Sequence, residues 1–203
     1  MTGDYPDALE EVIALLKRFP GIGRRSAERM ALAMLKWETD QIRALGEAVR
    51  DIPERIGRCP DCGGVAAAGE RCAVCADPTR DRSTICVVEE SPQVFAIEKG
   101  GGYRGLYHVL GGRLSPLDGE NGENLSTGAL LRRTAAGSGV REVILALGSD
   151  VEGRATAVYV ADLLKANPVS ISQPAQGLPA GADLSYADGA TIRAAFAGRR
   201  GME

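Results

Sequence analysis

Long apolar runs and histidine are what this 203-residue sequence has least of. No stretch approaches the roughly 20 consecutive apolar residues that a membrane-spanning helix needs, so we expect no membrane partner. Residues 1–6 include Asp4 and form no apolar core of the kind that an export signal requires, which predicts a cytoplasmic protein. The only histidine, His108, lies within an apolar run, where it is poorly placed to anchor a catalytic triad. We predict that His108 packs in the core.

Charge is unevenly distributed along the chain. The net charge of −3 argues against a wholly basic nucleic-acid binder. Between Lys17 and Lys36, however, the sequence has six basic residues and one acidic residue, Glu28. From Ser83 to the end it has 11 basic and 13 acidic residues. We therefore expect any polyanion to bind near the N-terminus.

Four of the five cysteines form two CxxC pairs. The pairs are Cys59–Cys62 and Cys72–Cys75, and nine residues separate them. This spacing predicts one tetrahedral Zn²⁺ held by four thiolates, a closed shell that serves structure rather than hydrolysis. The alternative is a pair of disulfides or four unrelated thiols, and the reducing cytoplasm argues against disulfides. Cys86 lies in an apolar run and is expected to be an inert buried thiol.

Apolar periodicity predicts an α/β chain with a helical first block. The first three expected helices cover 7–18, 24–35 and 40–52, and Pro53 is expected to end the third. The expected strands cover 84–88, 106–110, 143–147 and 169–172, and the later expected helices cover 94–98, 124–133, 152–165 and 191–197. Asn124 or Ser126 is expected to cap the helix over 124–133. Strands that alternate with helices predict a mainly parallel sheet covered on both faces.

The bend between the first two helices combines glycine with arginine. Gly21 and Gly23 allow a tight turn with nothing to block approach to its amides, which suit a phosphate together with the start of the next helix. Arg24 and Arg25 flank that site, and Arg29 follows Arg25 on the same helix face. The alternative is a simple helical corner with a solvated basic face. The order of residues resembles the helix-hairpin-helix motif of DNA repair proteins.

Three carboxylates are expected at strand ends. Glu89 follows the strand over 84–88, and Asp150 and Glu152 follow the strand over 143–147. If the three carboxylates converge at this edge of the sheet, they could hold Mg²⁺. The alternative is that Asp150 or Glu152 only favours the N-terminus of the next helix. The pattern resembles the Toprim domain of topoisomerases and primases, except that Gly148 replaces the first aspartate of its Asp-x-Asp-x-Glu-Gly-like run.

With its three modules combined, the chain resembles the bacterial recombination mediator family RecR over nearly its full length. The matching segments are Pro20–Gly23, Arg25–Arg29, the four cysteines, Arg80–Glu89, Tyr103–Gly112, Leu114–Gly119, Val151–Ala157 and Gly177–Leu184. The sequence departs from the family at Gly148-Ser149-Asp150, where Asn-Pro-Thr is usual. Arg24 and Arg25 replace a common proline and a common lysine.

This resemblance implies a multidomain α/β architecture in four parts. Residues 1–54 would form a helix-hairpin-helix DNA-binding domain and residues 55–82 a small zinc finger with four cysteine ligands. Residues 83–178 would form a Toprim-type domain with a mainly parallel sheet. Residues 179–203 would form a helical C-terminal extension for oligomerisation.

The resemblance also implies a non-enzymatic, nucleoid-associated protein of recombinational repair that binds single- and double-stranded DNA. Such proteins form homodimers and ring-like homotetramers, with one structural Zn²⁺ per chain. They act with RecO, and with RecF, to load RecA onto single strands coated by single-strand-binding protein. Arg25 and Arg29 match hairpin positions tied to DNA binding, and the acidic face with Glu89, Asp150 and Glu152 is the expected docking surface for RecO.

Two other functions are weighed against this one. A Mg²⁺-dependent Toprim nuclease or primase-like enzyme would use Glu89, Asp150 and Glu152, but Gly148 weakens that site. A nucleophilic tyrosine is not evident either, because we expect the tyrosines at positions 103, 107, 159 and 186 to pack. A zinc-ribbon adaptor without DNA contact is the third interpretation, and the basic hairpin argues against it.

Overall fold

The computed structural model describes residues 5–115, 122–199 and 201, so residues 116–119 of the 114–119 motif lie outside the described part. The chain divides into two compact units, Met1–Arg55 and Ile56–Glu203. Of the helices in the described ranges, none has both the length and the apolar character needed to cross a bilayer.

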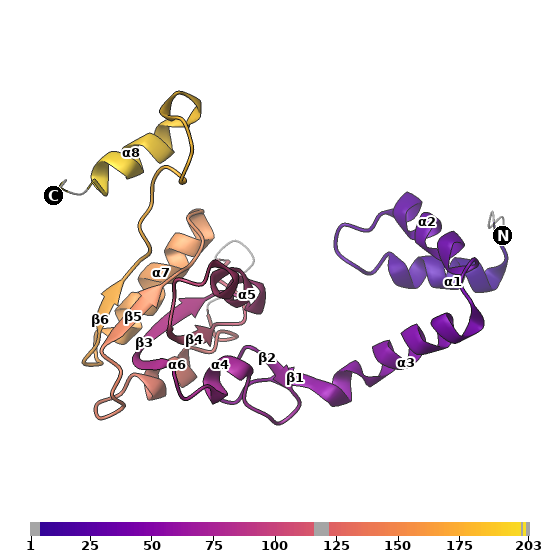
Figure 1. Cartoon of the computed structure of the whole chain (residues 1–203), viewed down its shortest axis with the longest axis horizontal. Helices are drawn as coiled ribbons and strands as arrows, with labels where there is room; N and C mark the ends of the chain where they lie inside the picture. Colours follow the sequence, from indigo (N-terminus) through magenta and orange to yellow (C-terminus); the bar gives the residue numbers. More distant parts are fainter. Residues whose placement is uncertain (1–4, 116–121, 200, 202–203) are drawn as a thin grey trace. The chain divides into compact units, whose positions relative to one another are not determined.

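Three helices make up the first unit (Figure 1). They are α1 (Asp7–Leu16), α2 (Arg24–Met34) and α3 (Thr39–Arg55). Helices α1 and α2 pack around Ile13, Ala27 and Ala31, each at most 1% exposed. Alanine at two of these positions lets the helices approach closely, since little side-chain volume separates them. All of α3 is described, and none of its residues is buried.

The prediction that Pro53 ends the third helix is wrong by two residues. Helix α3 continues through Pro53 to Arg55, where the first strand begins. A proline removes one amide donor, but the amides of the two residues after it can still donate to carbonyls one turn back, so the last turn persists beyond it. Apolar side chains of α3 remain exposed along one stripe, with Ile42 and Val49 39% and 56% exposed.

The second unit begins with a two-stranded antiparallel ribbon, β1 (Ile56–Arg58) and β2 (Val65–Ala67), and a one-turn helix, α4 (Ala73–Ala76). A four-stranded sheet follows, containing β3 (Asp81–Val88), β4 (Gly105–Val109), β5 (Glu142–Leu145) and β6 (Ser170–Ser172). Its order is β4-β3-β5-β6, and all three pairings are parallel, as the alternation of elements predicts.

Side chains of β3 alternate between two cores, one on each face of the sheet. Ile85 and Val87 pack with residues of α6 (Thr127–Arg133) and α7 (Val151–Leu164). Cys86 and Val88 pack on the opposite face, where residues of α4 and α5 (Ser91–Gly100) cover the sheet. The period of two in strand side chains produces this division. The predicted burial of Cys86 is confirmed, and burial raises the pKa of its thiol to about 11.

Helices α5 and α6 each begin three residues away from the expected position. Helix α5 starts at Ser91, because the side chains of Glu90 and Gln93 cap its first turn reciprocally. Helix α6 starts at Thr127. Of the two expected caps, Ser126 occupies the N-cap position, although its side chain makes no capping hydrogen bond, and Asn124 is wrong.

After β6 the chain forms a 3₁₀ turn, η1 (Leu184–Tyr186), and helix α8 (Gly189–Ala197). Asp188 accepts hydrogen bonds from the amides of Ala190 and Thr191, which starts α8 before the expected residue 191. Tyr186 is 91% exposed, so the expectation that it packs is wrong, whereas Tyr107 is buried as expected.

Candidate nucleic-acid interface and metal centre

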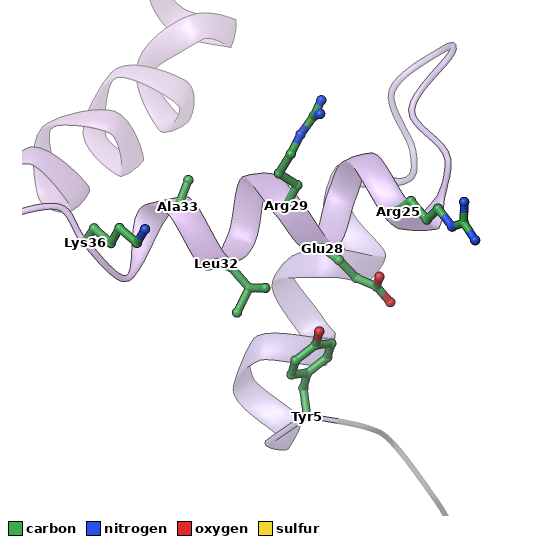
Figure 2. Close-up of a pocket in the computed structure, with 7 residues that line it drawn as sticks. All are labelled: Tyr5, Arg25, Glu28, Arg29, Leu32, Ala33 and Lys36. Atoms are coloured by element: carbon green, nitrogen blue, oxygen red, sulfur yellow. The ribbon is translucent and has the colours of Figure 1, made fainter.

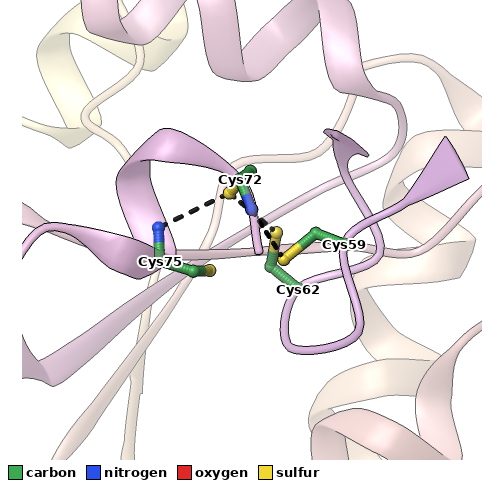
Figure 3. Close-up of side chains that lie close together, drawn as sticks. All are labelled: Cys59, Cys62, Cys72 and Cys75. Atoms are coloured by element: carbon green, nitrogen blue, oxygen red, sulfur yellow. Dashed lines mark hydrogen bonds between the residues drawn. The ribbon is translucent and has the colours of Figure 1, made fainter. Parts of the chain in front are cut away.

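The four predicted zinc ligands meet in one cluster (Figure 3). Cys59 and Cys62 lie in the turn after β1, while Cys72 caps α4 and Cys75 lies within it. The four sulfur atoms all lie within 4.8 Å of one another, and those of Cys62 and Cys72 are 3.6 Å apart. A tetrahedral ion with bonds of about 2.3 Å separates its sulfur ligands by roughly 3.8 Å. The sulfur positions therefore fit Zn²⁺.

Backbone amides point at these sulfurs. The amide of Cys72 lies 3.3 Å from Cys59 Sγ, and those of Gly64 and Cys75 lie 3.4 Å from Cys62 Sγ and Cys72 Sγ. A hydrogen bond with Cys75, assisted by the Gly64 amide, lowers the pKa of the Cys62 thiol, and the same contact raises the pKa of Cys75. Such donors stabilise thiolates, the form in which cysteine binds a metal. When bound, Zn²⁺ would crosslink the two turns, with no coordination position left open for substrate.

The hairpin between α1 and α2 is open to solvent. Gly21 has a φ of +75°, a left-handed conformation that favours glycine, and Gly23 is the N-cap of α2. A Cβ built on either glycine would meet no described atom within 4 Å. No side chain of the described residues caps the first turn of α2. Its first amides therefore remain available to an anion.

The three predicted arginines of the hairpin differ in their partners. Arg24 lies 2.9 Å from Glu10 and 2.7 Å from Glu28, and hydrogen bonds to these carboxylates raise its pKa. Arg25 and Arg29 form no ion pair with any residue in the described ranges, and both are exposed. Two of the three predicted cations thus keep an uncompensated charge, whereas the charge of Arg24 is neutralised locally.

Arg25 and Arg29 line a groove along α2 (Figure 2). Its volume is about 430 Å³, and it is lined by Tyr5, Arg25, Glu28, Arg29, Leu32, Ala33 and Lys36. Tyr5 and Lys36 are additions that we did not predict. Arg25 and Arg29 share one face of α2. Lys36 follows in the turn after the helix ends at Met34, and its place in the same basic stretch is a signal for it. Tyr5 precedes the helix and carries no such signal.

The three predicted carboxylates each have a partner within the fold. Glu89 accepts a 2.8 Å hydrogen bond from the amide of Gly148, the position that lacks the Toprim aspartate. Asp150 caps α7 by accepting a 2.8 Å hydrogen bond from the amide of Gly153, the structural role considered as the alternative to metal binding. That bond is the largest cause of the lowered pKa of Asp150.

Arg113 contacts both Asp150 and Glu152. It was not predicted from the sequence. Its guanidinium is 2.8 Å from Asp150 Oδ2 and 2.8 Å from Glu152 Oε2. The charges of Glu152 and then of Asp150 raise the pKa of Arg113. Within the described residues, the cysteine cluster is the one group of three or more histidine, cysteine or acidic side chains that meets the geometry of a metal site. At this edge of the sheet, a protein cation stands beside two of the three expected Mg²⁺ ligands.

Three family descriptions match successive parts of the chain. Residues 9–52 match "RecR, helix-hairpin-helix", residues 83–175 match "Toprim domain", and residues 177–200 match "RecR, C-terminal". The first match contains the open hairpin and the groove, and the second contains the parallel sheet and its acidic end.

Curated relatives match almost the whole chain. The recombination protein RecR of Rubrobacter xylanophilus is 47% identical over 196 residues, covering 97% of this chain and 98% of its own length. The RecR proteins of Acidothermus cellulolyticus and Moorella thermoacetica are each 45% identical over 199 residues, covering 98% of this chain and 99% of their own lengths. The chain belongs to the RecR family of recombination proteins, which implies a role in recombinational DNA repair.

Proposed function

We propose that this protein is a DNA-binding recombination mediator that performs no catalysis of its own. The observation that carries the proposal is the pair of exposed, unpaired guanidinium groups of Arg25 and Arg29 beside an open glycine hairpin. Phosphate groups of either single- or double-stranded DNA present the charge that this arrangement lacks.

The hairpin and the first turn of α2 would jointly bind the nucleic-acid backbone. Amides at Gly21, Gly23 and the first turn of α2 would donate to phosphate oxygens, and Arg25 and Arg29 would pair with the same or adjacent phosphates. Contacts of this kind fix the position of a strand without reading its bases. Binding should therefore be independent of sequence and steeply dependent on salt.

A homodimer or a ring-like homotetramer would multiply this weak contact. Helix α3 supports such an assembly, because an apolar stripe along it is exposed in the single chain; the stripe contains Ile42, Leu45, Val49 and Ile52. Exposed stripes of this kind mark contact surfaces. In the C-terminal segment, the side chains of Leu184 and Phe196 are 50% and 62% exposed. This segment is the second proposed contact between subunits. Several hairpins in one ring raise the effective concentration of each.

The remaining modules would serve structure and partner binding. One Zn²⁺ per chain, held by Cys59, Cys62, Cys72 and Cys75, would brace the second unit. The acidic end of the sheet, with Glu89, Asp150 and Glu152, would bind RecO. With RecO and RecF, the protein would promote the loading of RecA onto single strands coated by single-strand-binding protein, in the cytoplasm at the nucleoid.

Binding of labelled oligonucleotides at low salt tests the DNA contact. The variant Arg25→Ala/Arg29→Ala should bind single and double strands at least about tenfold more weakly than the parent, whatever their sequence. Arg43→Ala/Arg50→Ala is the matched control, since it removes two arginines of the same unit that are paired with Asp40 and Asp51. Equal affinity of the two double variants would remove the hairpin from the proposal.

The mediator role needs a separate measurement. RecA-dependent ATP hydrolysis on single strands coated by single-strand-binding protein should rise when this protein and RecO are added together. Arg25→Ala/Arg29→Ala should abolish that increase. Stimulation that is unchanged by the double variant would contradict a role of the hairpin in loading.

A further inference from the structure

The groove along α2 has two chemically different edges. Figure 2 shows Arg29 and Ala33 on one side of the helix and Glu28 and Leu32 on the other, where the ring of Tyr5 lies. Arg25 stands at the hairpin end. One edge is therefore cationic, and the other combines an aromatic ring with an aliphatic side chain.

The cationic edge is free to bind an anion. Arg25, Arg29 and Lys36 form no ion pair with any other described residue of the chain. The rise of an α-helix places Arg25 and Arg29 about 6 Å apart along the axis of α2. Lys36 follows in the turn just after the helix ends at Met34. Three positive charges in a row follow the path that one nucleic-acid backbone would take along α2.

The aromatic edge is built on the core of the first unit. Tyr5 is half-buried and packs against the cluster of Ile13, Ala27 and Ala31, which holds its ring in place. Its hydroxyl forms no hydrogen bond within the described part of the chain. Beside it, Leu32 is 37% exposed. A fixed ring next to an exposed aliphatic side chain presents a flat apolar surface to the groove.

Glu28 lies on the same edge as Tyr5 and Leu32 and makes that edge unfavourable for a phosphate. Its carboxylate lines the groove and is held 2.7 Å from the guanidinium of Arg24, on the apolar side of the helix. A phosphate is repelled from a carboxylate and attracted to the unpaired cations, so it would lie toward Arg29 rather than toward Tyr5. A neutral, planar group suits the Tyr5 side.

We infer that the groove holds one unstacked nucleobase, which lies against the Tyr5 ring and the Leu32 side chain. The phosphate backbone of the same strand lies along Arg25, Arg29 and Lys36. The volume of about 430 Å³ lies in the range of small-molecule sites, about 300–1,000 Å³, and has room for a base beside its phosphate. Bases of a duplex are stacked inside and cannot reach the ring, so this subsite serves single strands. Base–aromatic stacking tolerates any sequence, because every base has a π-face. The inference rests on the proposed DNA contact and adds a preference for single strands.

Abasic oligonucleotides test the subsite directly. A strand of abasic residues has the phosphate charge of an oligo-dT strand of equal length but no bases to stack. The parent protein should bind oligo-dT about 5- to 100-fold more tightly than the abasic strand. Tyr5→Leu should bind the two strands equally, whereas Tyr5→Phe, which keeps the ring, should discriminate like the parent. Duplex affinity should be the same in all three proteins.

The outcomes separate this inference from the function on which it rests. If Arg25→Ala/Arg29→Ala weakens binding to all strands but the parent binds oligo-dT and the abasic strand equally, the base subsite is overturned and the phosphate contact stands. If the double variant binds as the parent does, the phosphate contact itself fails. Should Tyr5→Leu not fold, Tyr5→Met, which also lacks the ring, takes its place, and equal binding of the two strands by the parent still overturns the subsite.

Discussion

The amide of Val109 donates a 2.7 Å hydrogen bond to the carbonyl of Cys62, which joins the first cysteine turn to the edge strand of the sheet. Val74 of α4 packs in the same core as Val109 and Tyr107. The cysteine module is therefore part of the packing of the second unit rather than an independent appendage.

Loss of the metal should consequently unfold more than the cysteine turns. We expect Cys72→Ser to lower the zinc content and the melting temperature of the second unit, because structural Zn²⁺ contributes on the order of 10 kcal/mol to small zinc folds. Atomic absorption and calorimetry measure the two quantities. Cys86→Ala is the matched control, since Cys86 lies outside the cluster and should leave zinc content unchanged. Full zinc content and an unchanged melting temperature in Cys72→Ser would contradict this account.

Protonation of His108 should make stability fall in mild acid. The predicted core position of His108 is confirmed, with Nε2 2.9 Å from the carbonyl of Ser126 and Nδ1 3.2 Å from the guanidinium of Arg133. Nε2–H therefore donates to Ser126, and Nδ1 accepts from Arg133. Burial, and then the charge of Arg133, lowers the pKa of His108 to about 4.

The sign follows from which state binds the proton first. Above pH 6.5, about the pKa of a histidine in the unfolded chain, His108 is neutral in both the folded and the unfolded protein. Between that pH and the lower pKa of the folded protein, only the unfolded chain binds a proton at His108. The free energy of unfolding should therefore fall by about 2 kcal/mol from pH 7 to pH 5 through this residue. Urea titrations of the parent and of His108→Gln at the two pH values measure it. An equal loss in both proteins would show that other groups cause the acid sensitivity.

Gly153 should not tolerate a side chain. A Cβ at this position would lie 2.3 Å from the carbonyl oxygen of Gly148, a backbone atom that cannot easily move. Gly153→Ala should lower the free energy of unfolding by about 1–3 kcal/mol. Gly46→Ala on α3 is the matched control, because its Cβ would meet no described atom within 4 Å and alanine favours a helix over glycine. If urea titrations gave Gly153→Ala the same free energy of unfolding as the parent, the close approach of Gly153 to the Gly148 carbonyl would be refuted.

Removal of Arg113 should expose a cation site at the acidic end of the sheet. The side chain is 44% exposed, so Arg113→Ala should leave the melting temperature unchanged. Asp150 and Glu152 would lose their shared counter-ion and should bind Mn²⁺ more tightly, which the loss of the free-ion electron paramagnetic resonance signal measures. Arg50→Ala is the control for the loss of a paired surface arginine. Equal Mn²⁺ binding by the parent and Arg113→Ala would show that Arg113 does not compete with a cation.

Features that depend on local spacing could be predicted from the sequence. The two CxxC pairs predicted the metal cluster, because each pair forms a tight turn of its own. Apolar runs predicted the parallel strands, since burial on both faces leaves a continuous apolar run such as that of Ile85–Val88. Helix starts moved where a side-chain cap, as at Asp188, overrode the apolar pattern.

Features that depend on contacts between residues far apart in the sequence could not be predicted. Arg113 and Asp150 are 37 positions apart and meet only because the carboxyl ends of parallel strands share one edge. Tyr5 reaches the α2 groove through the packing of α1 on α2, which no spacing rule encodes. The neutralisation of Arg24 likewise needs Glu10, 14 positions away on the other helix.

The salt dependence of single-strand binding tests the central claim most directly, because its slope counts the phosphates that the protein neutralises. Plotted as the logarithm of the binding constant against that of salt concentration, the slope should become shallower by about 1.4 per bound chain in Arg25→Ala/Arg29→Ala. It should stay at the parent value in Arg43→Ala/Arg50→Ala. Parallel lines for the parent and Arg25→Ala/Arg29→Ala would contradict the claim that the hairpin of the first unit holds the DNA backbone.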